Sequence, residues 1–102
     1  MTKSSSKFII LRRVHNKLLD ILVSYKVYIN HKQVGKISNG EELKIKVNSG
    51  IQNIQLKVVL ETSNELKVLV KNKNIYLECG NSGGIKFFGG NWLYLKKTNQ
   101  QN

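Results

Sequence analysis

Apolar and polar residues alternate along most of the chain with a period of two, and the 3.6-residue period of a helix is nearly absent. The clearest run extends from Ile21 to Ile29, where every second residue is apolar. Alternation of this kind is typical of a β-strand with one buried and one solvated face. Similar runs predict further strands at 8–13, 34–37, 43–47, 54–60, 66–70, 75–79, 85–88 and 92–95.

Polar or glycine-containing segments separate these runs, at Asn30–Gln33, Ser38–Glu41, Asn48–Gly50, Glu61–Glu65 and Lys71–Asn74. Asn-Gly pairs tolerate the left-handed backbone conformations that tight turns require. Turn signals recur about every ten residues, a spacing typical of small sandwiches and barrels. The pattern therefore predicts an all-β fold: a single antiparallel β-sandwich, immunoglobulin-like or carbohydrate-binding-like, with about 7–9 short strands.

The length of 102 residues fits one domain, and there is no proline and no segment with the composition of a linker. We expect a flexible N-terminus at 1–6, one sandwich domain at 7–97 and a disordered tail at 98–102. The polar character that defines this tail begins already at Lys96.

The central stretch from Tyr25 to Glu41, continued by Asn48-Ser49-Gly50-Ile51-Gln52-Asn53-Ile54, resembles the small PEGA-like β-domains of bacteria. The resemblance is best over residues 25–54 and extends loosely over 7–79. It rests on turn and core positions such as Val34-Gly35-Lys36-Ile37 and Asn39-Gly40-Glu41. His31, Ser49 and Gln52 depart from the glycine, proline and histidine of that pattern. The resemblance implies a sandwich used as an accessory or interaction module, and it supplies no catalytic residue.

The cellular compartment is predicted from what the sequence lacks. No run of about 18 apolar residues is present, and the polar start Met1–Lys7 is unlike the apolar core of a signal peptide. The single cysteine, Cys79, cannot form an internal disulfide, which favours a reducing cytoplasm. We expect Cys79 to be a small buried apolar residue rather than a reactive thiol. These features predict a cytoplasmic protein without membrane insertion.

The chain is strongly basic, with 17 Lys and Arg against 6 Asp and Glu and a net charge of +11. Such a charge favours nucleic acid or another anionic partner. Most of the lysines, however, are scattered singly through the predicted strands, and a chain rich in Lys, Asn and Ile also results from an AT-rich genome. Total charge does not separate these two explanations.

Nothing in the sequence has the pattern of a catalytic or metal site. Four of the six carboxylates lie in predicted turns, where solvation explains them. His15 and His31 have no ligand at metal-binding spacing. The glycine-rich segment 80–84 lacks the Gly-Lys-Ser/Thr ending of a phosphate-binding loop. We therefore expect no enzyme activity, no metal and no cofactor.

The best candidate for a binding surface is an aromatic segment interleaved with lysine near the C-terminus. Outward-facing aromatic rings beside cations can stack bases and neutralise phosphates, or can form the centre of a protein interface. The ordinary alternative is that the rings close one end of the core. The candidate binding residues are Lys86, Phe88, Trp92, Tyr94, Lys96, Arg12 and Arg13.

Two functional hypotheses follow from these residues. The first is a non-catalytic accessory module that binds a protein partner or forms a homo-oligomer, through an exposed strand edge or the aromatic segment. The second is a nucleic-acid-binding domain that uses its basic surface and exposed aromatics. The chain opens with a basic group formed by Lys7, Arg12, Arg13 and Lys17. Convergence of this basic N-terminal group with Lys96 and Lys97 would favour the second hypothesis.

Overall fold

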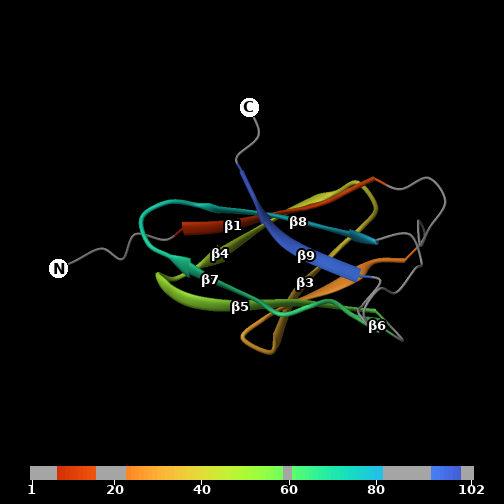
Figure 1. The fold of residues 1–102 in the computed structure, drawn as a ribbon, viewed down its shortest axis with the longest axis horizontal. Coiled ribbons are helices and arrows are strands. Elements are labelled where there is room, and N and C mark those ends of the chain that lie inside the picture. The colour runs from red at the N-terminus through yellow and green to blue at the C-terminus, as the bar shows by residue number, and fades with distance from the viewer. Residues whose placement is uncertain (1–6, 16–22, 59–60, 82–92, 100–102) are drawn as a thin grey trace.

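The computed structural model describes residues 7–15, 23–58, 61–81 and 93–99. Within these ranges the chain contains strands and connections but no helix. The strands form two sheets, which Figure 1 shows stacked on one another. Their bounds are β1 Lys7–Arg13, β2 Tyr25–Ile29, β3 Lys32–Ile37, β4 Glu42–Val47, β5 Gly50–Val58, β6 Glu61–Thr62, β7 Leu66–Val70, β8 Ile75–Asn81 and β9 Leu93–Thr98.

Sheet A has the strand order β4-β1-β8-β9. β1 pairs antiparallel with β4 and parallel with β8, and β8 pairs antiparallel with β9. The parallel pair corrects the prediction of a purely antiparallel sandwich. Alternation along a strand reports which face is buried, but it carries no information on which neighbour the strand selects.

Sheet B has the order β3-β2-β5, and its next position is shared by β6 and β7, which both pair with β5. Ser63 interrupts this shared strand. The Leu56 N–H donates to Ser63 Oγ (2.9 Å), and the Ser63 N–H donates to the Leu56 carbonyl (2.9 Å). Ser63 is buried, and β7 starts at Leu66 on the far side of the interruption.

The inner faces of the two sheets enclose one hydrophobic core in a sandwich-like arrangement. Alternate residues of each strand contribute to it, as the alternation of the sequence predicts. Sheet A supplies Ile9, Leu11, Ile45, Val47, Ile75, Leu77, Cys79, Leu93 and Leu95, and sheet B supplies Tyr25, Val27, Ile29, Ile37, Ile54, Leu56, Val68 and Val70. The burial of Cys79 confirms its expected place in the interior.

The turns match the predicted punctuation closely. Asn30 and His31 both have positive φ, 52° and 70°, which is the pairing that a two-residue hairpin turn requires. The Asn30 side chain joins this hairpin to β5, because Asn53 N–H donates to Asn30 Oδ1 (2.9 Å). Gly40, also at positive φ, lies in the β3–β4 turn.

Several predicted boundaries were wrong. β5 begins at Gly50 rather than at Ile54, β3 begins at Lys32 rather than at Val34, and Glu61–Thr62, predicted as part of a connector, form β6. The strand expected from Ile21 starts at Tyr25, and Val23 is exposed outside it, while residues 21–22 lie outside the described part of the chain. β9 runs through Lys96 to Thr98, residues that the polar composition assigned wholly or partly to a tail. Their pairing with β8 explains the difference, since Thr98 lies opposite Tyr76.

The predicted strand at 85–88, the N-terminus 1–6 and residues 100–102 lie outside the described ranges. In the part of the chain that is described, no helix has the length and apolar character that crossing a bilayer takes.

Candidate binding surface

The outer face of sheet A gathers most of the described candidate residues. In β1, Ile9, Leu11 and Arg13 point into the molecule, so Phe8 and Arg12 lie on the opposite face. The strand register then defines rows that cross the sheet. One row runs Lys44, Ile10, Tyr76 and Thr98 from β4 to β9.

A second row crosses all four strands with alternating charge. Glu42 of β4 lies opposite Arg12 of β1, Arg12 lies opposite Glu78 of β8, and Glu78 lies opposite Lys96 of β9. Opposite charges in directly facing positions stabilise neighbouring strands. We name this set, Glu42-Arg12-Glu78-Lys96, the alternating row.

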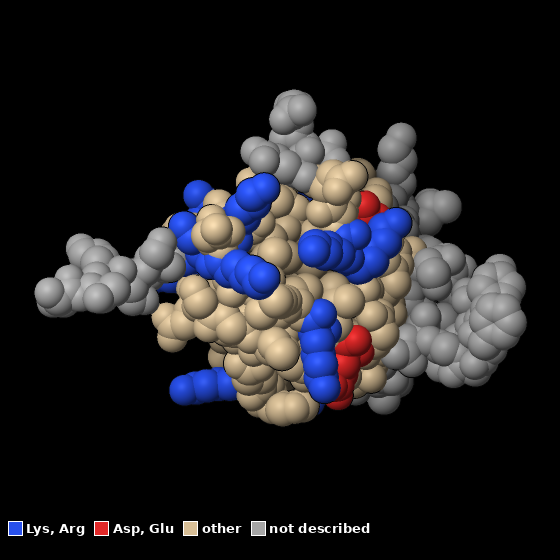
Figure 2. Space-filling model, turned by 60° about the vertical axis from the view of Figure 1, so that its left-hand side comes forward, with Lys and Arg blue, Asp and Glu red and all other residues tan. Residues whose placement is uncertain are grey.

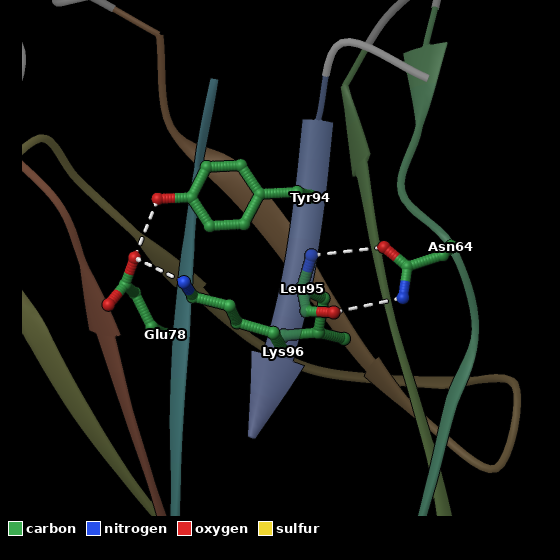
Figure 3. Close-up of polar contacts among 5 residues, drawn as sticks. All are labelled: Asn64, Glu78, Tyr94, Leu95 and Lys96. Carbon is green, nitrogen blue, oxygen red and sulfur yellow. Dashed lines mark hydrogen bonds and ion pairs between the residues drawn. The ribbon is translucent and has the colours of Figure 1, made fainter. Parts of the chain in front are cut away.

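Glu78 is the centre of the contacts at the β9 side of this row (Figure 3). The Tyr94 hydroxyl donates to Glu78 Oε2 (2.8 Å), and Lys96 Nζ lies 3.8 Å from the same oxygen. The Tyr94 ring lies across Gly80, where a Cβ would come within 3.0 Å of the phenol oxygen. Burial and then the hydrogen bond to Glu78 raise the pKa of Tyr94 above its ordinary value. Tyr94 and Lys96 are therefore already engaged within the protein.

Among the described residues, it is a side chain and not another strand that pairs with the outer edge of β9 (Figure 3). Asn64 Nδ2 donates to the Leu95 carbonyl (2.9 Å), and the Leu95 N–H donates to Asn64 Oδ1 (3.0 Å). This pair of hydrogen bonds copies the exchange between two facing strand residues. It also joins the margin of sheet B to the margin of sheet A.

Two half-buried aromatic rings, Phe8 of β1 and Tyr76 of β8, lie diagonally on neighbouring strands of the outer face of sheet A. Tyr94 of β9 is also half-buried on this face, but it lies opposite Gly80, beyond the alternating row from Tyr76. Lysines of the edge strand β4 flank the first ring: Lys46 lies opposite Phe8, and Lys44 Nζ lies 5.2 Å from the Phe8 ring centroid. We name Phe8, Tyr76 and the two β4 lysines the aromatic strip.

A basic groove continues from the aromatic strip at the end of the molecule where β1 and β8 begin. It is lined by Lys7, Asn72, Lys73, Asn74, Ile75, Tyr76, Lys97, Thr98 and Asn99. Three separate parts of the sequence supply its lysines, and none of these lining residues is acidic. Tyr76 belongs to both the groove and the aromatic strip.

Charge is unevenly distributed along the sandwich. Glu42 and Glu78 lie opposite Arg12, toward the end of β1, and Glu41 lies in the β3–β4 turn. The opposite end holds the groove and the β7–β8 turn. Figure 2 turns this end toward the viewer: Lys and Arg side chains stand across the visible face, and acidic groups are seen only toward its right. Lys7, Lys73 and Lys97, which are far apart in the sequence, thus come together at this end.

Arg13 does not take the surface position expected of it. Its side chain is 1% exposed, with the guanidinium 3.7 Å from the Tyr25 ring centroid. Nη1 donates to the carbonyls of Val23 (2.6 Å) and Ile37 (3.0 Å). Because β1 alternates inward and outward, neighbouring arginines cannot both reach solvent, and Arg12 alone of this pair is exposed.

Among the other candidates, Tyr94, Lys96 and Arg12 come together around Glu78 on sheet A, whereas Lys86, Phe88 and Trp92 lie outside the described residues. The sequence analysis missed the aromatic strip at Phe8 and Tyr76 and the groove lysine Lys73, whereas Lys7 belongs to the basic N-terminal group that it named. Strand parity could have placed Phe8 and Tyr76 on an outer face. Only the parallel β1–β8 pair places them on the same face of neighbouring strands.

The described residues give little support to catalysis. Burial raises the pKa of the Cys79 thiol to about 12, which opposes formation of a nucleophilic thiolate. No group of three or more His, Cys, Asp or Glu residues in the described ranges is arranged to hold a metal ion. His15 packs against Gly40 and, with Arg12, lines an open depression.

Comparison with known proteins found no matching family model, no matching curated protein and no matching solved structure. The PEGA-like resemblance therefore stays a prediction.

Proposed function

We propose that this protein is a non-catalytic module that binds single-stranded nucleic acid on the outer face of sheet A. One observation carries the proposal: the aromatic strip places rings on neighbouring strands beside lysines and leads into a groove that holds three more. Sheet faces with this combination bind single strands, because rings stack on bases while cations neutralise the backbone. We also propose that the sandwich is immunoglobulin-like or carbohydrate-binding-like and that the protein is located in the cytoplasm.

The distribution of charge on sheet A supports this choice of surface. Phosphates make nucleic acid a dense polyanion, so a binding face needs cations that carboxylates of the protein do not neutralise. Lys44, Lys46 and the groove lysines meet this condition at one end of sheet A. The far end, where Glu78 binds Lys96, does not. The ligand is therefore expected to follow the strip from Phe8 through Tyr76 into the groove.

Fluorescence anisotropy with a labelled oligothymidylate tests the proposal. We expect micromolar binding at low salt that weakens with a log–log slope of about −2, as expected for about three phosphate contacts. The double substitution Lys44→Gln, Lys46→Gln is expected to weaken binding roughly tenfold. Tyr76→Leu, which retains an apolar side chain without a π face, is expected to weaken it by fivefold or more.

The matched control removes the same charge from sheet B, with Lys32→Gln and Lys67→Gln. Both lysines are exposed and lie on other strands, β3 and β7. An oligonucleotide that fails to bind at low salt, or that loses equal affinity in both double variants, would overturn the proposal.

Self-association is the second candidate, and a separate observation favours it. Ile51 of β5 and Leu69 of β7 lie directly opposite each other and are 69% and 52% exposed. Light scattering across a concentration series tests this candidate, with Leu69→Lys as the variant expected to restore a monomer. A wild-type chain that stays monomeric at all concentrations would remove it.

A further inference from the structure

A row of three lysines crosses the outer face of sheet B. Lys26 of β2 lies opposite Lys36 of β3 on one side and opposite Lys57 of β5 on the other. Tyr25 and Val27, which flank Lys26, are buried in the core, so the Lys26 side chain points outward. We name this set, Lys36-Lys26-Lys57, the lysine row.

The protein itself does little to offset the repulsion in the lysine row. Like charges in directly facing positions destabilise a sheet, and here the same central lysine faces two of them. No ion pair joins any of the three to a carboxylate of the described residues. Lys57 lies opposite Thr62 and has its Nζ 4.5 Å from the Tyr28 ring centroid, so its two described contacts of this kind are with uncharged side chains.

We propose that the lysine row is a phosphate-binding site that takes a chain of adjacent phosphate groups. Facing side chains on neighbouring strands are about 5 Å apart at Cβ, so the row presents ammonium groups over about 10 Å. Each ammonium offers three donors on a flexible stem, which suits oxygens of unfixed geometry. A bound oligoanion places a phosphate beside each lysine, so that attraction between ligand and lysines offsets the repulsion among the lysines.

This site does not rest on the function proposed for sheet A, because the two surfaces are the opposite outer faces of the sandwich. If both are correct, one domain holds a phosphate chain on each face and can bring two strands of nucleic acid together. The shared chemistry is a run of phosphates, and its source is either a nucleic-acid backbone or a free oligophosphate.

Lys26→Glu is the decisive variant, because it gives sheet B the sign alternation already present in sheet A. Without ligand, we expect its melting temperature to rise by about 4 °C, since two repulsive pairs become attractive. With millimolar tripolyphosphate, we expect the wild-type melting temperature to rise by about 5 °C and that of Lys26→Glu to rise by clearly less, since only the groove lysines of sheet A still bind the anion. Lys67→Glu, on β7 opposite Asn53, is the control with equal charge change.

The two sources are separated by titrating tripolyphosphate and oligothymidylate into the Lys44→Gln, Lys46→Gln double variant, with and without Lys26→Glu. Binding of either anion that is lost with Lys26→Glu supports the lysine row and identifies the source. If neither anion binds the double variant, or if Lys26→Glu binds both as well as Lys67→Glu does, the lysine row is not a phosphate site. Oligonucleotide binding that depends on Lys26 but not on Lys44 and Lys46 would reject the sheet A proposal alone.

Discussion

The outer faces of the two sheets order their charged side chains in opposite ways. On sheet A, Arg12 lies between two glutamates and the alternating row is balanced within the protein. On sheet B, Lys26 lies between two lysines and the lysine row has no such balance. Both rows use the same geometry of facing strand positions, so the sequence of signs alone makes one stabilising and the other repulsive.

The difference shows how to interpret a net charge of +11. Positive charge that alternates with carboxylates adds stability and leaves little for a ligand to neutralise. Positive charge that faces itself, as in the lysine row, or that collects in a groove without acidic lining, is available to an external anion. Three further predictions sharpen or break this comparison.

The largest expected effect is on stability, and it distinguishes buried Arg13 from its exposed neighbour Arg12 in the alternating row. Arg13→Met removes the donors to the carbonyls of Val23 and Ile37 while retaining most of the apolar stem. We expect a loss of about 3 kcal/mol in the free energy of unfolding, because the buried hydrogen bond to Ile37 and the part-buried one to Val23 are both lost. Arg12→Met, one position along and exposed, loses only its two surface pairs and is expected to lower it by about 1 kcal/mol or less. Urea unfolding of the two variants measures both values, and equal losses would contradict the assignment of inward and outward faces.

The second prediction uses the two groups with raised pKa, Cys79 and Tyr94, which both belong to sheet A. Because folding favours their protonated forms, the associated stability is complete below about pH 9 and is lost as the pH rises toward 12. For Cys79 the loss by pH 11 is expected to be on the order of 2 kcal/mol. Denaturant unfolding at pH 8 and pH 11 measures it.

Cys79→Ala and Tyr94→Phe are the controls for this pH dependence. All other titrating groups are common to the three proteins, so the difference between their pH slopes isolates each side chain. A slope that neither variant reduces would show that these groups do not govern alkaline unfolding.

The smallest expected effect comes from removing one of the two carboxylates of the alternating row. Glu78→Gln removes the carboxylate that holds Lys96 and leaves an amide oxygen to accept from Tyr94. We expect oligothymidylate affinity at low salt to rise about threefold, since one more cation becomes available to phosphate. Glu65→Gln, next to β7, is the matched control, and equal gains in both variants would point to net charge rather than to the row.

Much of the fold could be predicted from the sequence, because burial of one face imposes alternation on every strand. Local pattern is enough to predict the turns at Asn30-His31 and at Gly40. It also predicts that the side chains of Leu77 and Cys79 point into the core. The pairing of β1 with β8 could not be predicted in this way. It joins residues more than sixty positions apart, and alternation is identical for every possible partner.

The candidate surface was predicted less well for the same reason. Arg12, Tyr94 and Lys96 do share one face, but Glu78 lies among them and engages two of them. The lysine row consists of residues that appear scattered singly in the sequence at positions 26, 36 and 57. Only the register of three strands reveals them as neighbours, so the charge pattern that matters is the one across the sheet.

The Asn64 carboxamide has a consequence for how these molecules can grow into larger arrays. Backbone groups on the free side of β9 come from every second residue, and those of Leu95, at the middle, already bind Asn64. A second molecule that adds a strand there would have to displace the Asn64 carboxamide from the Leu95 backbone. This margin of sheet A is therefore a less favourable border for strand addition than one whose backbone groups have no such partner.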